Sequence, residues 1–231
     1  MVQYIANIGF NHNGDVNCMK TILKICKEEG FDLAKFNIKK DTGKFEFDIF
    51  ELTEIYDYAK NIKFKVYPCC FDIVSVNYLS GLTDTCEIPI EKMHDTDFIN
   101  YVKSKFKKII FDINNLDIDY IENLFYSHGP FLTMYYTGNN NGKNLKNLLF
   151  LKNKYARLKL GLCSDKLSNL SNIVGITNNI DYIQKNITLC RDLNGDNHVY
   201  ALEPNEYRQF IKKMKEVEKI LWIWKDLKKY K

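Results

Sequence analysis

Several features that assign a chain to a specialised class are missing from these 231 residues. The seven cysteines are odd in number and none stands at a paired metal-ligand spacing, which argues against a zinc ribbon and against a disulfide framework. No apolar run is long enough to span a bilayer, and the N-terminus has neither a charged leader region nor a cleavage site. We therefore expect a cytoplasmic protein in a reducing compartment, without a membrane partner.

A contiguous surface of one charge is also missing. The 33 basic and 29 acidic residues are mixed along the same segments, so the net charge of +4 does not build the basic stripe that nucleic acid requires. The exception is the basic tail over residues 223–231, where a solvated helix end is favoured over a nucleic-acid or membrane site. We predict no nucleic-acid partner and divide the chain into one domain over residues 1–222 and this tail.

Short β-rich runs alternate with longer amphipathic runs along the whole chain. This pattern is typical of a parallel sheet whose strands are joined by crossover helices. About eight strand candidates occur, the number that closes a barrel, and the last helix is predicted over Pro204 to Trp222. Polar turns at residues 11–14, 139–142 and 194–197 follow strands, where barrel enzymes assemble their sites. The fold class is α/β, a single (β/α)8 TIM barrel.

Two segments resemble the N-acetylneuraminate (sialic acid) synthase family. Residues 4–37, YIANIGFNHNGDVNCMKTILKICKEEGFDLAKFN, resemble its first strand, NHNG turn, first helix and second strand. Residues 182–221, YIQKNITLCRDLNGDNHVYALEPNEYRQFIKKMKEVEKIL, resemble its last strand, Gly/Asp/His loop and LEP-initiated helix. The resemblance implies a barrel that condenses phosphoenolpyruvate with an N-acetylated hexosamine, using a divalent metal such as manganese. Family members normally continue into a small antifreeze-like domain; we expect the barrel domain only, with no C-terminal antifreeze-like domain.

Positions to which the resemblance assigns acid/base and metal chemistry are changed. Asn7 stands where the family has a Glu near the reacting carbons, and an amide cannot take up a proton as a carboxylate does. The two family metal-binding histidines correspond to Lys166 and Asn186. An ammonium group repels a dication and an isolated amide binds a transition metal poorly. We therefore predict no metal site and no cofactor.

The phosphoenolpyruvate pocket implied by the resemblance is altered as well. Lys35 and Ser164 match binding positions, whereas Glu87 and Asp112 replace a lysine and a serine. Two new carboxylates near a phosphate and a carboxylate repel them, by several kcal/mol in a partly dry site. Affinity for a trianion is expected to fall sharply.

The alternation of side chains along a strand predicts which residues face the barrel interior. If Asn186 points inward, Gln184 does too, while Lys185 points toward the helices. In the part of the site that the resemblance assigns to the sugar, Gln184 replaces a Glu of the family and Asn197 replaces an Asp. His198 is the same residue as in the family. The predicted substrate-binding residues are Asn7, Lys35, Asn37, Glu87, Asp112, Ser164, Gln184, Asn186 and His198.

Lys35, Asp165 and Lys166 are the candidate catalytic residues. The Lys166 ammonium would stand near the charge of the family metal and could polarise a carbonyl or bind a carboxylate. In the alternative interpretation these lysines only satisfy neighbouring carboxylates, as Lys35 with Glu87 or Lys166 with Asp112. The sequence leaves both interpretations open.

Two further features are interpreted as structural. His12 of the NHNG turn is expected to stabilise the turn and not to act as a catalyst. The adjacent Cys69 and Cys70 have no histidine signal nearby and are expected to be small core residues.

These features favour a diverged barrel that binds or acts on a sugar or sugar acid in surface-glycan biosynthesis, without the family metal. Two alternatives remain. A catalytically inactive subunit that supports a glycan-biosynthesis enzyme fits the replacement of the metal ligands and the expected absence of the antifreeze-like domain. A weak phosphoenolpyruvate-dependent nonulosonic acid synthase contradicts most of the residue evidence. Whether the protein is an enzyme stays open, and its assembly is expected to be a homodimer or a complex with a glycan-biosynthesis enzyme.

Overall fold

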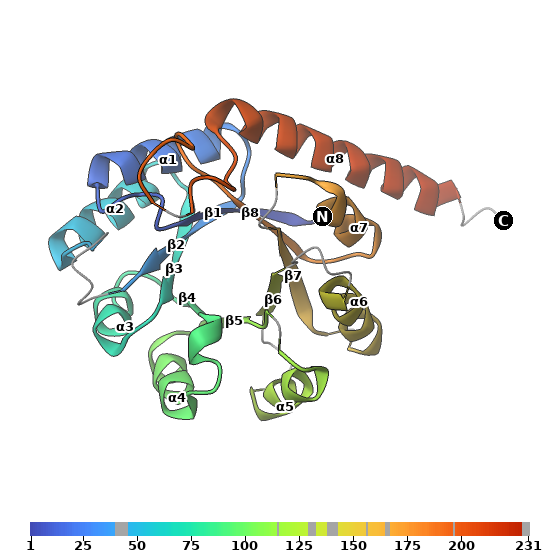
Figure 1. The fold of residues 1–231 in the computed structure, drawn as a ribbon, viewed down its shortest axis with the longest axis horizontal. Helices are drawn as coiled ribbons and strands as arrows, with labels where there is room; N and C mark the ends of the chain where they lie inside the picture. The colour runs from blue at the N-terminus through green and yellow to red at the C-terminus, as the bar shows by residue number, and fades with distance from the viewer. Residues whose placement is uncertain are drawn as a thin grey trace.

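Strands and helices alternate along the chain, as the repeated pattern predicts (Figure 1). The computed structural model of the protein describes residues 1–39, 46–114, 116–128, 133–137, 143–155, 157–164, 167–195 and 197–227. The strands are β1 (Gln3–Gly9), β2 (Leu33–Ile38), β3 (Lys65–Cys70), β4 (Thr85–Ile88), β5 (Lys108–Asp112), β6 (Thr133–Thr137), β7 (Lys159–Ser164) and β8 (Tyr182–Asn186). The helices are α1 (Val16–Glu28), α2 (Ile49–Asn61), α3 (Ile73–Leu79), the 3-10 helix η1 (Ile90–Lys92), α4 (Thr96–Lys105), α5 (Ile118–His128), α6 (Lys143–Lys154), α7 (Leu170–Thr177) and α8 (Pro204–Leu227).

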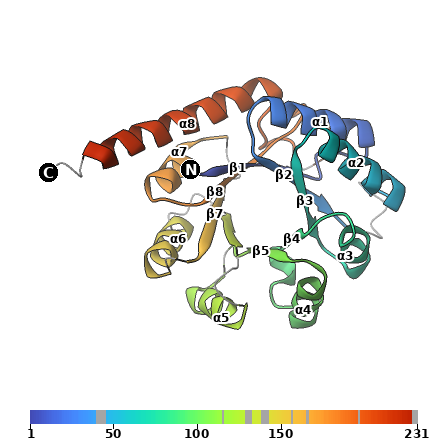
Figure 2. The ribbon, with the colours of Figure 1, turned by 180° about the vertical axis from the view of Figure 1, so that it is seen from behind.

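The strands form one parallel sheet that curves round on itself. Each strand pairs with the next in the chain, and β8 pairs with β1 in a register that runs from Gln3 opposite Tyr182 to Asn7 opposite Asn186. The helices lie around the outside of the sheet in both views (Figures 1 and 2). The α/β class and the parallel sheet predicted from the sequence are confirmed. In this arrangement the C-terminal ends of all strands meet at one face.

Aspartates at helix N-termini end several loops on that face. Their carboxylates accept hydrogen bonds from backbone N–H groups in the first turn of α1, α2, α3 and α4, and the residues are Asp15, Asp48, Asp72 and Asp95. Each cap satisfies a donor that the helix leaves unpaired and stabilises the helix by about 1 kcal/mol. These caps fix the loops that lead from the strand ends into the helices.

The inside of the barrel is apolar toward the N-terminal ends of the strands. Ile5, Tyr67 and Ile110 are buried there and pack with Leu33 and Tyr182. The larger apolar core lies between the sheet and the helices. Polar side chains are therefore left to the C-terminal end of the barrel interior, where the strands open to solvent.

Helix α8 is longer than the sequence predicts. It continues to Leu227, past the predicted end at Trp222 and into the predicted tail, of which residues 228–231 lie outside the described residues. Its C-terminal end extends beyond α7 and away from the barrel (Figures 1 and 2). Within the described part of the chain, none of the helices is both long enough and apolar enough to cross a membrane.

Candidate functional site

A cavity of about 430 Å³ opens at the C-terminal face of the barrel. The predicted site residues that line it are Asn7, Lys35, Asn37, Glu87, Asp112, Gln184 and Asn186. The other lining residues are Ile8, Gly9, Asn11, Cys163, Asn197 and Tyr200. Of the remaining predicted residues, Asp165 and Lys166 and the side chain of Ser164 lie outside the described part of the structure.

The strand register explains why these residues converge. Asn7 pairs with Lys35 across β1 and β2 and with Asn186 across β1 and β8. Lys185, between Gln184 and Asn186, is fully buried on the other face, with its Nζ 5.9 Å from the ring centre of Phe210 on α8. The predicted alternation of inward and outward side chains on β8 is confirmed.

Lys35 and Glu87 form a buried ion pair inside the barrel. Lys35 Nζ lies 2.8 Å from Glu87 Oε1, and the two side chains are 8% and 3% exposed. Burial alone would lower the pKa of Lys35, but the adjacent Glu87 carboxylate more than offsets this and raises the pKa above its ordinary value. Lys35 therefore stays an ammonium ion whose nearest partner belongs to the protein. This is the pairing that the alternative interpretation of the sequence described.

Asp112 lies near this pair at the end of β5. Its Oδ1 accepts a hydrogen bond from the backbone N–H of Asn114 at 3.0 Å. Burial and then the Glu87 carboxylate raise the pKa of Asp112 to about 7, against the opposing effects of the Asn114 N–H and Lys35. The carboxyl group can therefore both hold and release a proton near neutral pH, which suits a hydroxyl-bearing ligand.

Carboxamides surround the charged pair. Asn7 Nδ2 donates to Asn186 Oδ1 at 2.6 Å, and the Tyr67 hydroxyl donates to Gln184 Oε1 at 3.4 Å. Three buried acceptor atoms of the described cavity lining have no hydrogen-bond partner, namely Asn7 Oδ1, Asn37 Oδ1 and Glu87 Oε2. An unsatisfied buried acceptor costs about 1–3 kcal/mol. Ligand hydroxyl groups that reached these atoms would supply the missing donors.

The donor set at Asn186 does not fit the divalent metal that the resemblance implies. Its Oδ1 already accepts a hydrogen bond from Asn7 Nδ2, and Cys163 Sγ lies 4.0 Å from the same oxygen. In the described ranges, no group of three or more His, Cys, Asp or Glu residues could hold a metal ion. An amide oxygen that already accepts a hydrogen bond from an N–H group is a poor ligand for a transition metal.

The NHNG turn after β1 supports the cavity from one side. Asn11 Nδ2 donates to the carbonyl of Ile187 at 2.8 Å. His12 Nδ1 accepts from the Gly14 N–H at 3.1 Å, and its Nε2 lies 3.2 Å from the Asn37 carbonyl. Burial lowers the pKa of His12 to about 4, partly opposed by the contact with Asn37, so the ring is neutral. His12 stabilises the turn, as the sequence predicts.

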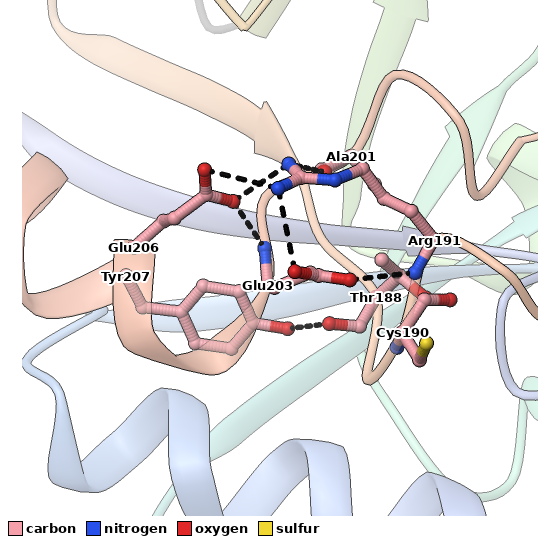
Figure 3. Close-up of polar contacts among 7 residues, drawn as sticks. All are labelled: Thr188, Cys190, Arg191, Ala201, Glu203, Glu206 and Tyr207. Atoms are coloured by element: carbon pink, nitrogen blue, oxygen red, sulfur yellow. Dashed lines mark hydrogen bonds and ion pairs between the residues drawn. The ribbon is translucent and has the colours of Figure 1, made fainter.

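The loop between β8 and α8 is held at its base by Arg191 (Figure 3). The guanidinium donates to Glu206 at 2.7 and 3.2 Å, to Glu203 at 3.3 Å and to the carbonyl of Ala201 at 3.3 Å. The Tyr207 hydroxyl donates to the carbonyl of Thr188. We call these contacts the Arg191 clamp; they fix both ends of the loop that reaches the cavity.

His198 lies within this loop but does not line the cavity. Its Nδ1 lies 2.6 Å from Thr188 Oγ1 and its Nε2 lies 3.1 Å from Asn13 Oδ1, and the residue is buried. Burial lowers its pKa. The sequence placed His198 at the substrate; in the structure its ring joins the last loop to the first turn. Asn197 and Tyr200 of the same loop line the cavity instead.

Sequence reasoning did not single out all of the lining residues. Asn11 belongs to a polar turn that the sequence places at this face, so a signal for it existed. Cys163 and Tyr200 carried no such signal, because a strand cysteine and a loop tyrosine are usually structural.

A family model and several named relatives match this chain. Residues 132–225 match the NeuB family. The N,N'-diacetyllegionaminic acid synthase of Campylobacter jejuni is 23% identical over 256 residues, which cover 94% of this chain and 76% of the relative. The N-acetylneuraminate-9-phosphate synthase of Mus musculus is 22% identical over 94% of this chain and 70% of its own length.

Solved structures share the fold. The N-acetylneuraminic acid (sialic acid) synthetase of Leptospira borgpetersenii superposes with a TM-score of 0.84 at 18% identity, over 95% of this chain and 85% of that one. The spore coat polysaccharide biosynthesis protein spsE of Bacillus subtilis gives a TM-score of 0.79 at 18% identity, over 95% and 69% of the two chains. At these identities the likeness shows the fold alone.

Proposed function

Because this chain belongs to the N-acetylneuraminate synthase family, we propose that it binds or acts on a sugar or sugar acid in surface-glycan biosynthesis, without a divalent metal. In this proposal the site is the cavity at the C-terminal face of a single (β/α)8 barrel. The names of the relatives support sugar-acid biosynthesis as the setting. The residues of this chain support the class of substrate and the independence from metal.

The buried Lys35–Glu87 pair carries the proposal. Among the described lining residues, one ammonium faces two carboxyl groups, those of Glu87 and Asp112. The cavity therefore offers no net positive field to a phosphate trianion. Phosphoenolpyruvate would have to displace Glu87 from Lys35 and meet the carboxylates at close range, which costs several kcal/mol. A neutral or singly charged ligand avoids both costs.

The amides suit hydroxyl groups. Asn7 Oδ1, Asn37 Oδ1 and Glu87 Oε2 are acceptors without partners in the described structure, and sugar hydroxyls are donors of the right kind. Ser164, Asp165 and Lys166 complete the proposed site on the sequence argument. There Lys166 would bind a ligand carboxylate, and Lys166→Ala would weaken binding by about 1.5–3 kcal/mol.

The cavity also bears on the rival function of an inactive supporting subunit. A site released from selection for binding is expected to keep unpaired charges or to fill with apolar side chains. Here Lys35 is paired with Glu87 and the lining is mostly polar, which supports a retained ligand site. Assembly as a homodimer or with a glycan-biosynthesis enzyme remains the prediction made from the sequence.

A ligand screen by saturation-transfer NMR tests the proposal. The protein is treated with EDTA and mixed with N-acetylmannosamine, N-acetylneuraminate or phosphoenolpyruvate. We expect transfer to a sugar or sugar acid, lost in the Asn37→Ala variant and kept in Asn61→Ala, which removes an exposed amide at the end of α2. Transfer to none of the ligands, or equal transfer in both variants, would refute the proposed site.

A further inference from the structure

The end of α8 carries an exposed apolar segment. Ile220, Trp222, Ile223 and Trp224 are 68%, 68%, 44% and 52% exposed. We call these four residues the α8 apolar end. The chain has two tryptophans in total, and both belong to it. Large exposed side chains scattered singly need no explanation, but four within five residues do.

The apolar side chains surround the helix. Successive residues of an α-helix are about 100° apart, so Trp222, Ile223 and Trp224 cover the sides of α8 that Leu221 leaves free. Leu221 itself packs partly buried against the main core. A helix that is apolar all round is normally buried. The barrel covers only the Leu221 side, because this part of α8 extends past α7 (Figures 1 and 2).

Cationic side chains precede this segment. Lys212, Lys213, Lys215 and Lys219 are all exposed. For Lys215 and Lys219, no ion pair is found among the described residues. From residue 212 to residue 231 the sequence has eight lysines and three acidic residues. One of those acids, Glu218, accepts hydrogen bonds from the Val2 N–H and the Tyr4 hydroxyl at 2.7 Å each.

A groove of about 1000 Å³ runs beside Trp222 at the N-terminal end of the barrel and contains Met1 and Lys219. Its acidic residues have partners within the protein. Asp181 pairs with two lysines, at 2.6 and 2.8 Å, and Asp32 accepts from the Tyr4 N–H at 2.7 Å. The surface around the α8 apolar end is therefore cationic and apolar together.

We propose that the α8 apolar end and its lysines dock on an anionic lipid surface. Tryptophan is favoured at the boundary between lipid headgroups and acyl chains, and lysines near the surface are attracted to anionic lipids. Five consecutive apolar residues are far too few to span a bilayer. The segment therefore reaches only the boundary between headgroups and acyl chains, with the lysines that precede it at the headgroups.

A lipid surface fits better than a second copy of this chain. Two copies that met through this segment would bring the lysines of both α8 helices close together, and like charges at short range repel. An anionic surface neutralises them instead. The docking site lies at the N-terminal end of the barrel, since Glu218 contacts Val2, whereas the cavity opens at the opposite face. Docking therefore leaves the cavity open, and the inference does not depend on the cavity ligand.

Tryptophan fluorescence of the full chain tests the inference, because both tryptophans report on this segment alone. Vesicles of phosphatidylcholine with an equal amount of phosphatidylglycerol should shift the tryptophan emission to shorter wavelength and reduce its quenching by acrylamide. Vesicles of phosphatidylcholine alone should do neither. Added salt should weaken the effect, because exposed charges are screened.

Variants measured by vesicle sedimentation separate the two contributions. Lys215→Gln with Lys219→Gln should weaken binding to anionic vesicles several-fold, while the matched pair Lys24→Gln with Lys60→Gln should not. Trp222→Ala with Trp224→Ala should weaken it tenfold or more, while Phe50→Ala, which removes an exposed ring on α2, should not.

Three results would overturn the inference. The first is unchanged emission with anionic vesicles. The second is an emission shift that follows protein concentration without lipid and accompanies a doubled mass, which would assign the segment to a second copy. The third is vesicle binding that ignores the tryptophan replacements.

Discussion

Lys35 Nζ on β2 lies 2.8 Å from Glu87 Oε1 on β4, and both side chains are buried in the barrel. By the resemblance, Lys35 is a residue that would hold phosphoenolpyruvate, and Glu87 stands where a second lysine would. The carboxylate at position 87 therefore has two effects on the site. It removes the cation of the second family lysine, and it pairs with the ammonium of Lys35. This single contact accounts for most of the proposed shift from a phosphorylated ligand to a neutral or singly charged one.

Removing one partner of this pair should destabilise the fold. Glu87→Gln leaves the Lys35 ammonium buried without its nearest carboxylate, and such a loss costs about 3–5 kcal/mol. Urea unfolding of the variant and the wild type gives the difference. Lys35→Met with Glu87→Leu removes both charges and should recover most of the stability. A Glu87→Gln variant as stable as the wild type would show that the pair contributes nothing.

The pKa of Asp112, raised to about 7, predicts a dependence of stability on pH. Because the folded-state pKa exceeds the unfolded value, the folded protein binds more protons between about pH 4 and 7. The contribution of Asp112 is full below pH 4 and is lost as the pH rises through 7. Relative to Asp112→Asn, wild-type stability should fall by a few kcal/mol across this range, since one pKa unit corresponds to about 1.4 kcal/mol. If the curves of stability against pH run parallel for the wild type and Asp112→Asn, the raised pKa of Asp112 is refuted.

His12 should act in the opposite direction. Its pKa is lowered to about 4, so its contribution is full above about pH 6.5 and is lost as the pH falls toward 4. His12→Gln should remove this loss of stability in acid, whereas replacement of the exposed His94 should not. Should His12→Gln fail to fold, the imidazole shifts of the wild type in a pH titration by NMR give the same answer. A His12 that titrates near pH 6.5 would contradict the prediction.

The Arg191 clamp should control the loop that carries Asn197 and Tyr200. Arg191→Ala removes the contacts to Glu203 and Glu206 and should weaken ligand binding about threefold to tenfold, the effect of losing about one net hydrogen bond. Hydrogen exchange should become faster in the loop and stay unchanged in the strands. Arg208→Ala, which breaks an exposed pair with Glu29, is the control and should leave both measurements unchanged.

Alternation along the strands predicted much of the site. Asn37, Gln184 and Asn186 line the cavity and Lys185 faces the helices, because a period of two assigns faces wherever a strand is recognised. The sequence left open whether Glu87 pairs with Lys35. Glu87 reaches it across the inside of the barrel, and that distance depends on the curvature of the whole sheet.

Loops and helix ends were less predictable. His198 was expected at the ligand but joins Thr188 to Asn13, because the Arg191 clamp sets the path of the loop. That path depends on contacts between residues whose side chains have no periodic signal. The end of α8 was expected at Trp222, yet the helix continues to Leu227. Local sequence at that point does not distinguish a frayed end from a docking segment.

Titration calorimetry on EDTA-treated protein distinguishes a metal-independent sugar-acid site from a site for phosphoenolpyruvate. N-acetylneuraminate and phosphoenolpyruvate are titrated separately, each with and without added manganese. We predict that the sugar acid binds with the same affinity in both conditions and that phosphoenolpyruvate releases no heat of binding in either. Binding of phosphoenolpyruvate that requires manganese would contradict it and would restore the metal-dependent synthase as the function of this barrel.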